Sequence, residues 1–231
     1  MTERFLSDRL YLAMDTSGGV GSVAVGQGAD VLARSVITRR GDQAARLVPV
    51  MEQTLADAGV DLSEIAGIVV GEGPGSFTGV RVAAATAKGL ARGLGCPMWA
   101  VSSLAGFGMG VPGPGVRYVL FDARSDRIYG ACYAVAQGVT TLVPPHGGVL
   151  TEVLQSALPA HCLFLGDGAL AHAAAIEKAG FAVVPQPADE AIGARIAEGL
   201  LSWLAAMPDP AAVDDPTDWE PRYIRDWEPS G

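Results

Sequence analysis

The chain has little positive charge. Sixteen lysines and arginines stand against 25 aspartates and glutamates, which gives a formal net charge of −9 over 231 residues. A protein that binds nucleic acid by itself neutralises phosphates with clustered basic side chains, and this balance has the wrong sign for that. If nucleic acid is the substrate, we expect a partner to supply the positive surface.

Cysteine and histidine patterns typical of disulfide or metal sites are also missing. The three cysteines, Cys96, Cys132 and Cys162, are odd in number and show no CxxC spacing. We interpret them as buried thiols of a cytosolic protein. The three histidines form no HExxH or HxxxH pair, and we place His146, which follows two prolines, in a loop. No metal site on this chain is expected.

Long uninterrupted apolar segments are absent. The first apolar run, Leu10 to Met14, is too short for the core of a signal peptide. The uncharged stretch from Gly93 to Val116 is interrupted by glycines and prolines, unlike a membrane-spanning helix. Apolar residues nevertheless make up 49% of the chain, enough to build a core. We therefore expect a folded cytoplasmic protein without membrane contact.

Hydrophobic spacing in the first half predicts strands followed by helices. Three short runs rich in apolar and β-branched residues predict an antiparallel meander over 10–14, 20–25 and 31–37. From Asp42 to Gly59 the spacing becomes helical, with Pro49 expected to kink the helix. The pattern continues with a strand at 68–70, a glycine-rich turn, a long helix at 77–94 and a strand at 97–101.

The second half repeats elements of the first half. Tyr118-Val-Leu-Phe-Asp122 matches Tyr11-Leu-Ala-Met-Asp15, and Leu163 to Gly168 matches Ile68 to Gly73, in the same order and at similar separations. We predict an internal duplication, with two related α/β lobes formed by residues 1–105 and 106–231. The second lobe would end in a helix near residue 206 followed by a proline-rich extended arm.

Two glycine- and hydroxyl-rich turns could hold a phosphate. The turn at Asp15 offers a carboxylate and two hydroxyls to a phosphate or hydrated cation, although on local sequence alone we favour an Asx turn that closes a hairpin. The stretch from Gly71 to Gly79 allows close backbone approach at the start of a helix, but no Gly-Lys-Ser/Thr follows it. The candidates for a degenerate phosphate loop are Asp15, Thr16, Ser17, Gly73, Gly75 and Ser76.

On the predicted helix at 77–94, apolar and small side chains cover more of the helix surface than a helix buried on one side requires. Its charges fall on one narrow stripe, and the rest is small or apolar. An ordinary core helix is possible, but we favour a helix that packs on its own sheet and on a partner. The candidate interface residues, two of them on the preceding helix, are Thr78, Gly79, Arg81, Ala84, Ala87, Lys88, Ala91, Leu47 and Met51.

Motifs along almost the whole chain resemble the TsaB family. The most specific is Gly71-Glu-Gly-Pro-Gly-Ser-Phe-Thr-Gly-Val-Arg81, accompanied by Tyr11 to Ser17, Phe121-Asp-Ala-Arg124 and Pro221-Arg-Tyr-Ile-Arg225. The resemblance implies an actin/hexokinase/Hsp70-like (ASKHA) fold of two duplicated lobes, each a mixed sheet with helices. It also implies the dimerisation subunit of the bacterial machinery that makes N6-threonylcarbamoyladenosine at position 37 of tRNA (t6A37).

The resemblance further implies a scaffold without catalytic residues. The related catalytic subunit, TsaD, holds a metal with a His-x-x-x-His pair, and the matching positions here are Ser103 and Phe107. A chain of this kind would dock on TsaD as a heterodimer through its first lobe, with TsaE joining as an ATPase. It would bind no cofactor alone, whereas ATP and metal belong to the assembled complex, and it would reach tRNA only through that complex. Asp42 departs from the family, whose members often carry histidine there.

Two other classes of function stay open. One is an enzyme: an actin-like ATP-dependent phosphotransferase that uses Asp15 and the loop from Gly73 to Gly79, or a glycoprotease-type peptidase. The peptidase interpretation lacks a plausible set of nucleophile, base and metal. The other is a homodimeric binding module that uses the same helix without TsaD.

Overall fold

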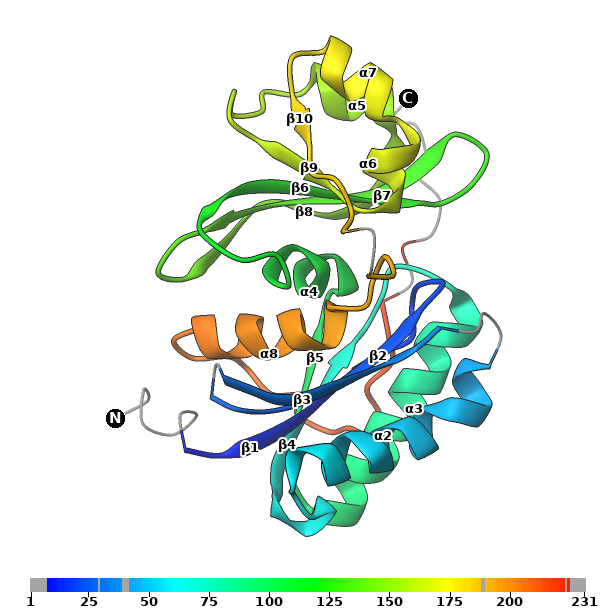
Figure 1. Cartoon of the computed structure of the whole chain (residues 1–231), viewed down its shortest axis with the longest axis vertical. Helices are drawn as coiled ribbons and strands as arrows, with labels where there is room; N and C mark the ends of the chain where they lie inside the picture. The colour runs from blue at the N-terminus through cyan, green and yellow to red at the C-terminus, as the bar shows by residue number, and fades with distance from the viewer. Residues whose placement is uncertain (1–7, 29, 39–41, 188–189, 223, 225–231) are drawn as a thin grey trace.

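The chain folds into two sheets that lie one above the other, with helices between them and on both outer faces (Figure 1). The computed structural model describes residues 8–28, 30–38, 42–187, 190–222 and 224. Each sheet has five strands and mixes parallel with antiparallel pairs. The two-lobed α/β architecture expected from the sequence is confirmed.

The first sheet has the order β3-β2-β1-β4-β5. Its antiparallel meander is followed by two strands that run parallel to β1, and its strands are β1 (Leu10–Asp15), β2 (Gly21–Gln27), β3 (Asp30–Ile37), β4 (Ile65–Gly71) and β5 (Met98–Val101). The outer face is covered by α2 (Gln43–Ala58), which continues through Pro49, and α3 (Phe77–Leu94); η1 (Leu62–Glu64) leads into β4. The predicted strands and helices of this half are thereby confirmed.

The second sheet repeats this topology in the order β10-β9-β6-β7-β8. Its strands are β6 (Gly115–Asp122), β7 (Arg127–Val135), β8 (Val139–Val149), β9 (Leu163–Leu165) and β10 (Ala182–Val183). The short helices on its outer side are α5 (Leu150–Gln155), α6 (Asp167–Ala171) and α7 (Ala173–Lys178). Each strand occupies the place of its counterpart five strands earlier, so the internal duplication is visible in the fold.

Two helices fill the space between the sheets. The helix α4 (Ser103–Met109) lies against the second sheet, and α8 (Ile196–Ala206) lies against the first (Figure 1). One apolar cluster runs from Val69 of the first sheet through Leu104 and Leu200 of these helices to Val119 of the second. Each half of the chain therefore contributes its last helix to the middle layer. The division into lobes at residues 105 and 106 stays a prediction.

The helices α4 and α8 meet backbone to backbone through glycines. A Cβ atom on Gly199 would lie 1.8 Å from the carbonyl oxygen of Gly106, and one on Gly110 would lie 2.7 Å from that of Arg195. Glycine removes the side chain that would hold two helices apart, so the axes can approach more closely than ordinary residues permit. This contact sets the spacing of the two sheets.

Arg117 fixes the segment that leads from α4 into the second sheet. Its side chain is buried, and the guanidinium donates hydrogen bonds to the carbonyl oxygens of Gly108, Val111 (2.7 Å), Pro112 (3.1 Å) and Gly113. The last carbonyls of a helix have no partner within the helix, and a guanidinium supplies several donors at once. Burial lowers the pKa of Arg117, and these acceptors compensate for the loss of water.

The expectation that His146 lies in a loop is wrong. His146 belongs to β8, together with Pro144 and Pro145. A proline lacks the amide donor of a sheet, but Pro144 and Pro145 lie at a register shift where β8 has no ladder partner on β7, and β8 is an edge strand. The His146 ring lies within hydrogen-bond distance of the Tyr118 hydroxyl (3.3 Å) and the Pro144 carbonyl oxygen (3.0 Å), which is a packing role.

The cysteines are unpaired thiols. Cys132 and Cys162 are buried and Cys96 is half-buried, in agreement with the interpretation as core thiols. Within the ranges given above, no helix combines the length and the apolar character that a bilayer span requires.

The glycine contact predicts a large effect of one methyl group. Replacing Gly199→Ala forces α8 away from Gly106, so we expect the free energy of unfolding to fall by about 1–3 kcal/mol or more. The matched control is Gly89→Ala on α3, where the added Cβ meets nothing within 4 Å. That change should stabilise by about 0.4–1 kcal/mol. Urea unfolding of both variants measures the difference, and equal stabilities would contradict the packing argument.

Candidate functional site

A cavity of about 640 Å³ opens between the loops of the two lobes. The start of α3 and the turn after β1 form its lower wall, and the turn after β6 and the start of α6 form its upper wall. Polar side chains on these walls belong to Ser17, Ser76, Thr78, Asp122, Arg124 and Asp167. Clefts between lobes are common ligand sites, which makes this cavity the candidate site.

Asp15 is closed off from the cavity. Its side chain is fully buried, and Oδ1 accepts hydrogen bonds from the amide (2.9 Å) and hydroxyl (2.8 Å) of Ser17. Oδ2 accepts a hydrogen bond from the Ser103 hydroxyl. Burial raises the pKa of Asp15, while the hydrogen bonds from Ser103 and Ser17 act in the opposite direction. The Asx-turn interpretation is confirmed, and a carboxylate engaged in this way does not fit a cation or phosphate site.

Ser103 joins three loops at one point. Its hydroxyl donates to Asp15 and accepts from the Gly73 amide (3.1 Å), and its own amide donates to the Gly73 carbonyl oxygen (2.8 Å). A Cβ atom on Gly71 would lie 1.8 Å from the Asp15 carboxylate, so only glycine leaves room for this arrangement. Where the family resemblance implies the first histidine of the TsaD pair, this chain therefore has a hydrogen-bonded structural serine.

Phe107 stands where the resemblance implies the second histidine of that pair. Its ring packs edge to face on Phe121, with centroids 5.5 Å apart and planes at 80°. An aromatic pair of this geometry stabilises packing and offers no metal ligand. Across the described residues, no group of three or more histidine, cysteine, aspartate or glutamate side chains is placed to hold a metal ion. The residues present at this point do not fit the metal of the catalytic relative.

The turn after β1 and the glycine-rich loop are locked together. The Thr16 hydroxyl donates to the Gly79 carbonyl oxygen (2.6 Å), and the Ser76 amide donates to the Ser17 carbonyl oxygen (2.7 Å). A Cβ atom on Gly75 would lie 2.3 Å from that same Ser17 oxygen. The glycines of this loop thus serve contact between two loops of the same chain.

The structure divides the six phosphate-loop candidates into two groups. Ser17, Gly75 and Ser76 line the cavity. The others, Asp15, Thr16 and Gly73, hold the loops behind it through the hydrogen bonds given above. Ser76 also begins α3, and its hydroxyl accepts from the Gly79 amide (3.3 Å), as expected for a helix cap. Phosphate binding by this loop stays a prediction.

The upper wall differs from the lower wall. Arg124, Ser125 and Asp126 form a left-handed turn with φ of 65°, 54° and 60°. Asp122 accepts from the Arg124 amide (2.8 Å), and Asp167 accepts from the Asp122 amide (3.1 Å). Burial raises the pKa of Asp167, and the charge of Asp122 adds to this effect. The two halves of the duplication therefore present unlike surfaces.

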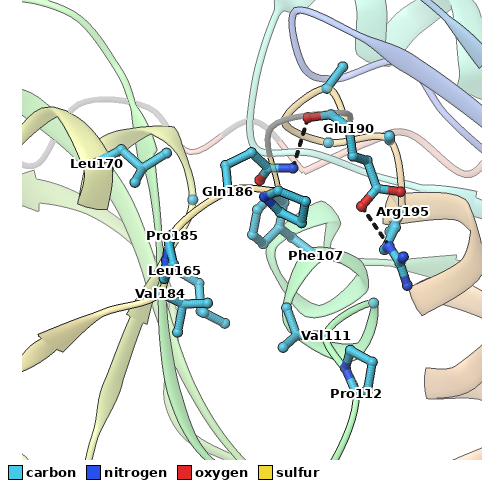
Figure 2. A pocket seen from close by; sticks show the side chains of 16 residues that line it. Phe107, Val111, Pro112, Leu165, Leu170, Val184, Pro185, Gln186, Glu190 and Arg195 are labelled. Atoms are coloured by element: carbon cyan, nitrogen blue, oxygen red, sulfur yellow. Dashed lines mark hydrogen bonds and ion pairs between the residues drawn. The ribbon is translucent and has the colours of Figure 1, made fainter.

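A smaller apolar pocket of about 200 Å³ adjoins the cavity (Figure 2). Leu165, Leu170, Val184 and Pro185 line it from the second lobe, and Phe107 and Val111 face them. Sequence reasoning missed this pocket because its residues come from the separate segments 107–112, 165–170, 184–187 and 190–195. The turn at Gly166 was the one local signal, and glycine is required there by a φ of 98°.

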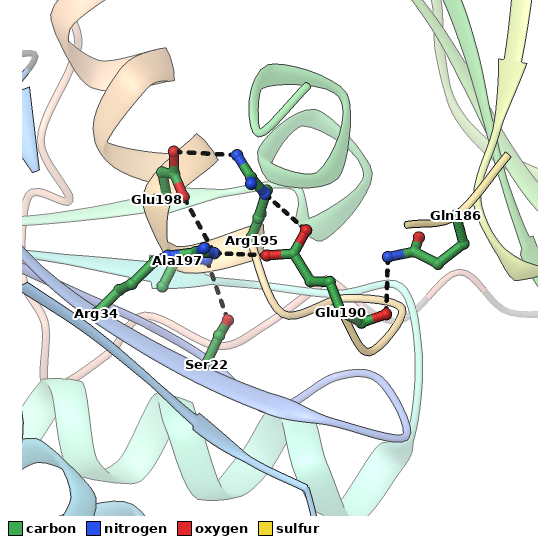
Figure 3. A network of polar contacts seen from close by, with 7 residues as sticks. All are labelled: Ser22, Arg34, Gln186, Glu190, Arg195, Ala197 and Glu198. Carbon is green, nitrogen blue, oxygen red and sulfur yellow. Dashed lines mark hydrogen bonds and ion pairs between the residues drawn. The ribbon is translucent and has the colours of Figure 1, made fainter. Parts of the chain in front are cut away.

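An ionic network holds the loop before α8 against the first lobe (Figure 3). Glu190 pairs with Arg34 of β3 and with Arg195, at 2.7 Å in each case, and Arg34 also reaches Glu198 at 3.5 Å. Burial opposes the charge on Glu190, but the two guanidinium groups hold its pKa below the usual value. Gln186 from the second-lobe side donates to the Glu190 carbonyl oxygen (3.1 Å). The network therefore spans both lobes.

Most of the predicted interface residues face the interior of the chain. The apolar sides of α2 and α3 cover the first sheet, which buries Leu47, Met51, Gly79, Ala84, Ala87 and Ala91. In this structure these residues cannot contact a partner, because the chain's own core covers them. The alanines on α3 allow close packing on the sheet.

An exposed face of α2 and α3 nevertheless carries large apolar side chains. Phe77 is 54% exposed and Val48 is 45% exposed, and Thr78 and Arg81 are exposed beside Phe77. The Arg81 guanidinium lies 4.0 Å from the centre of the Phe77 ring. We call these four residues the α2–α3 face. Lys88, further along α3, is half-buried and donates to the Trp219 carbonyl oxygen (2.7 Å) of the chain's own C-terminal arm.

Comparisons with known proteins agree with this geometry. The family model described as "TsaD: tRNA N6-adenosine threonylcarbamoyltransferase" matches residues 40–198. The chain is 32% identical over 171 residues to the "tRNA threonylcarbamoyladenosine biosynthesis protein TsaB" of Bacillus subtilis, covering 72% of this chain and 74% of that protein. The Escherichia coli protein of the same name is 37% identical over 125 residues, covering 53% and 54%.

Solved structures show the same fold. An uncharacterized Pseudomonas aeruginosa protein with similarity to peptidase YeaZ superposes with a TM-score of 0.77 at 28% identity, covering 94% of this chain and all of that one. Component A of (R)-2-hydroxyglutaryl-CoA dehydratase from Acidaminococcus fermentans superposes with a TM-score of 0.50 at 12% identity, covering 87% and 100%, which is a likeness of fold alone. The actin/hexokinase/Hsp70-like fold is confirmed.

The closed site predicts different effects for two adjacent serines. Ser103→Ala leaves a buried carboxylate oxygen and the Gly73 amide short of a partner, so we expect a loss of about 1–3 kcal/mol in the free energy of unfolding. Ser102→Ala is the matched control, because the Ser102 hydroxyl is buried and faces the Tyr133 hydroxyl instead of the Asp15 carboxylate. Its stability should stay close to that of the parent. Equal losses would show that Ser103 is not the joining residue.

Asp15 also predicts a pH dependence. Because burial raises its pKa above 3.8, the folded chain holds this proton more tightly than the unfolded chain. The unfolding free energy therefore falls as pH rises from 3.8 through the raised pKa, by about 1.4 kcal/mol for each unit of the rise. Asp15→Asn lacks this loss, so its stability relative to the parent should improve between about pH 4 and about pH 7. Urea unfolding measures both stabilities at each pH. A constant difference in unfolding free energy between the parent and Asp15→Asn over this pH range would refute the argument.

Proposed function

The chain belongs to the TsaB family, and on that premise we propose that it serves tRNA threonylcarbamoyladenosine biosynthesis as a non-catalytic scaffold subunit. Its relatives carry the name of that biosynthesis. The scaffold role is supported by the closed geometry at Asp15. Ser103 ties this carboxylate to the loop after β4, at the position where the sequence resemblance implies a metal-binding histidine in the catalytic relative.

The proposed partner is a TsaD-like catalytic subunit. The TsaD family model matches more than half of this chain, so the two subunits share a fold. Related folds can pair through equivalent faces in a pseudo-symmetric heterodimer. The α2–α3 face fits this role, because large exposed apolar side chains mark interaction sites and an arginine beside an aromatic ring is typical of an interface centre.

The remaining parts of the machinery belong to other subunits in this proposal. A TsaE-like ATPase joins the pair, and ATP and metal are held in the assembled complex. The formal charge of −9 supports the view that tRNA reaches this chain only through the complex, since each phosphate contact requires a basic side chain. A homodimer through the same α2–α3 face is the alternative for the chain without its partner.

The enzymatic alternatives have weaker support. A phosphotransferase of this fold needs a carboxylate that faces the phosphates, and Asp15 faces Ser17 and Ser103 instead. A peptidase needs a nucleophile and a base within hydrogen-bond reach of each other. Reconstitution decides between these functions: threonylcarbamoyl transfer to tRNA should require this chain together with TsaD and TsaE, and this chain alone should show no transfer or peptidase activity.

The docking proposal predicts a surface-specific loss of binding. Val48→Asp and Phe77→Asp each place a charge on the α2–α3 face, and we expect each to weaken TsaD binding by about thirtyfold, or about 2 kcal/mol. Leu142→Asp on β8 of the second lobe is the control, because Leu142 is as exposed as Val48, at 45%. Titration calorimetry with purified TsaD measures the three affinities, and circular dichroism verifies the folds. If only Leu142→Asp weakens TsaD binding, or if no variant does, the TsaD interface does not lie on the α2–α3 face.

A further inference from the structure

We propose that the C-terminal arm, residues 207–222 with residue 224, is a strap that ties the second lobe to the first and holds the cleft at one opening. The arm leaves α8, which lies between the two sheets, passes below the first sheet in this view and rises along one side of it (Figure 1). This inference does not depend on the proposed function, because its argument uses contacts within this chain alone.

The first part of the arm is fixed to β5. The Trp99 indole donates to the Pro210 carbonyl oxygen (3.0 Å), and the Val213 amide donates to the Met98 carbonyl oxygen (2.8 Å). Since β5 is the edge strand of the first sheet, the arm covers backbone groups that would otherwise face solvent. Val213 also packs against the apolar cluster beneath α2 and α3.

The middle of the arm lies on α3. The Lys88 ammonium donates to the Trp219 carbonyl oxygen, and Trp219 packs against the same apolar cluster. Hydrogen bonds from Thr217 hold the pKa of Asp215 below its usual value, and the charges of Arg92 and Lys88 act in the same direction. The basic stripe of α3 is thus used, in part, by the chain's own arm.

The last part of the arm crosses from one lobe to the other. The positive charge of Arg222 acts on Glu72, a half-buried residue at the end of β4 whose pKa is raised by burial and lowered by this arginine. Two residues later, Ile224 lies against β8: a Cβ atom on Gly147 would be 3.4 Å from its Cγ2. Arg222 therefore interacts with the first lobe, and Ile224, two residues later, packs on the second lobe.

The arm adds a second attachment between the lobes, at a distance from the middle layer. The sheets already meet through α4 and α8, where the side chains of Ile196 and Leu200 lie against Gly106. Packed helices can still slide or rotate past each other by small amounts. An attachment away from these helices opposes that rotation. In the absence of the arm contacts, the two walls of the 640 Å³ cavity would move relative to each other.

A distance measurement across the cleft tests the strap. Spin labels are placed on the exposed positions Gln53 of α2 and Thr141 of β8 in a Cys96→Ser background, since Cys132 and Cys162 are buried. The double variant Arg222→Ala/Ile224→Asp removes both contacts of the crossing. We expect its distance distribution, measured by pulsed electron resonance, to become broader and to include longer distances than the parent.

Two controls isolate the crossing. The conservative variant Arg222→Lys/Ile224→Val should reproduce the parent distribution, and so should Asp214→Lys, a charge reversal on the part of the arm beside β5. A distribution for Arg222→Ala/Ile224→Asp that superposes on that of the parent overturns the proposal. So does equal broadening in Asp214→Lys, because the effect would then not depend on the crossing.

A protease-cleavable insertion after Thr217 covers the case in which the double variant does not fold. The spin-labelled protein that carries the insertion is purified with its backbone intact. The distances between the two labels are then recorded before and after cleavage. Broadening on cleavage supports the strap, and an unchanged distribution rejects it. The proposed function is tested separately, by the affinity of the α2–α3 face variants for TsaD. A negative result for the strap therefore does not contradict the proposed function.

Discussion

The structure depends on the contact between α4 and α8. The two sheets touch each other through these helices, and the absence of side chains at Gly106 and Gly199 sets how close they lie. The same contact fixes where α4 begins. Because α4 begins at Ser103, its first residue reaches the end of β1 and binds Asp15. The spacing of the lobes and the closed arrangement around Asp15 are therefore two results of one helix position.

Much of the fold follows from local sequence. The bounds of α3, the meander of the first sheet and the Asx turn at Asp15 are all visible as spacing or as short polar motifs. The repeated strand pattern also predicts the second sheet, since related sequences fold to related topology.

The features that sequence could not supply depend on contacts between distant segments. Alanines on α3 are equally compatible with a partner and with the first sheet, and only the fold shows that Ala84 and Ala87 pack inward. The role of Ser103 requires β1, β4 and α4 to meet, although their residues are far apart in the chain. His146 was misplaced because its neighbouring prolines indicate a loop, unless one knows that the strand lies at an edge.

The composition of β8 affects how the protein behaves before it meets any partner. An exposed edge strand of 11 residues would normally invite a strand from another molecule to pair with it, which is a common first step of aggregation. Pro144 and Pro145 carry no amide donor and lie where the register of β8 against β7 shifts. A strand from another molecule therefore finds an interrupted ladder along this part of the edge, which opposes pairing between copies.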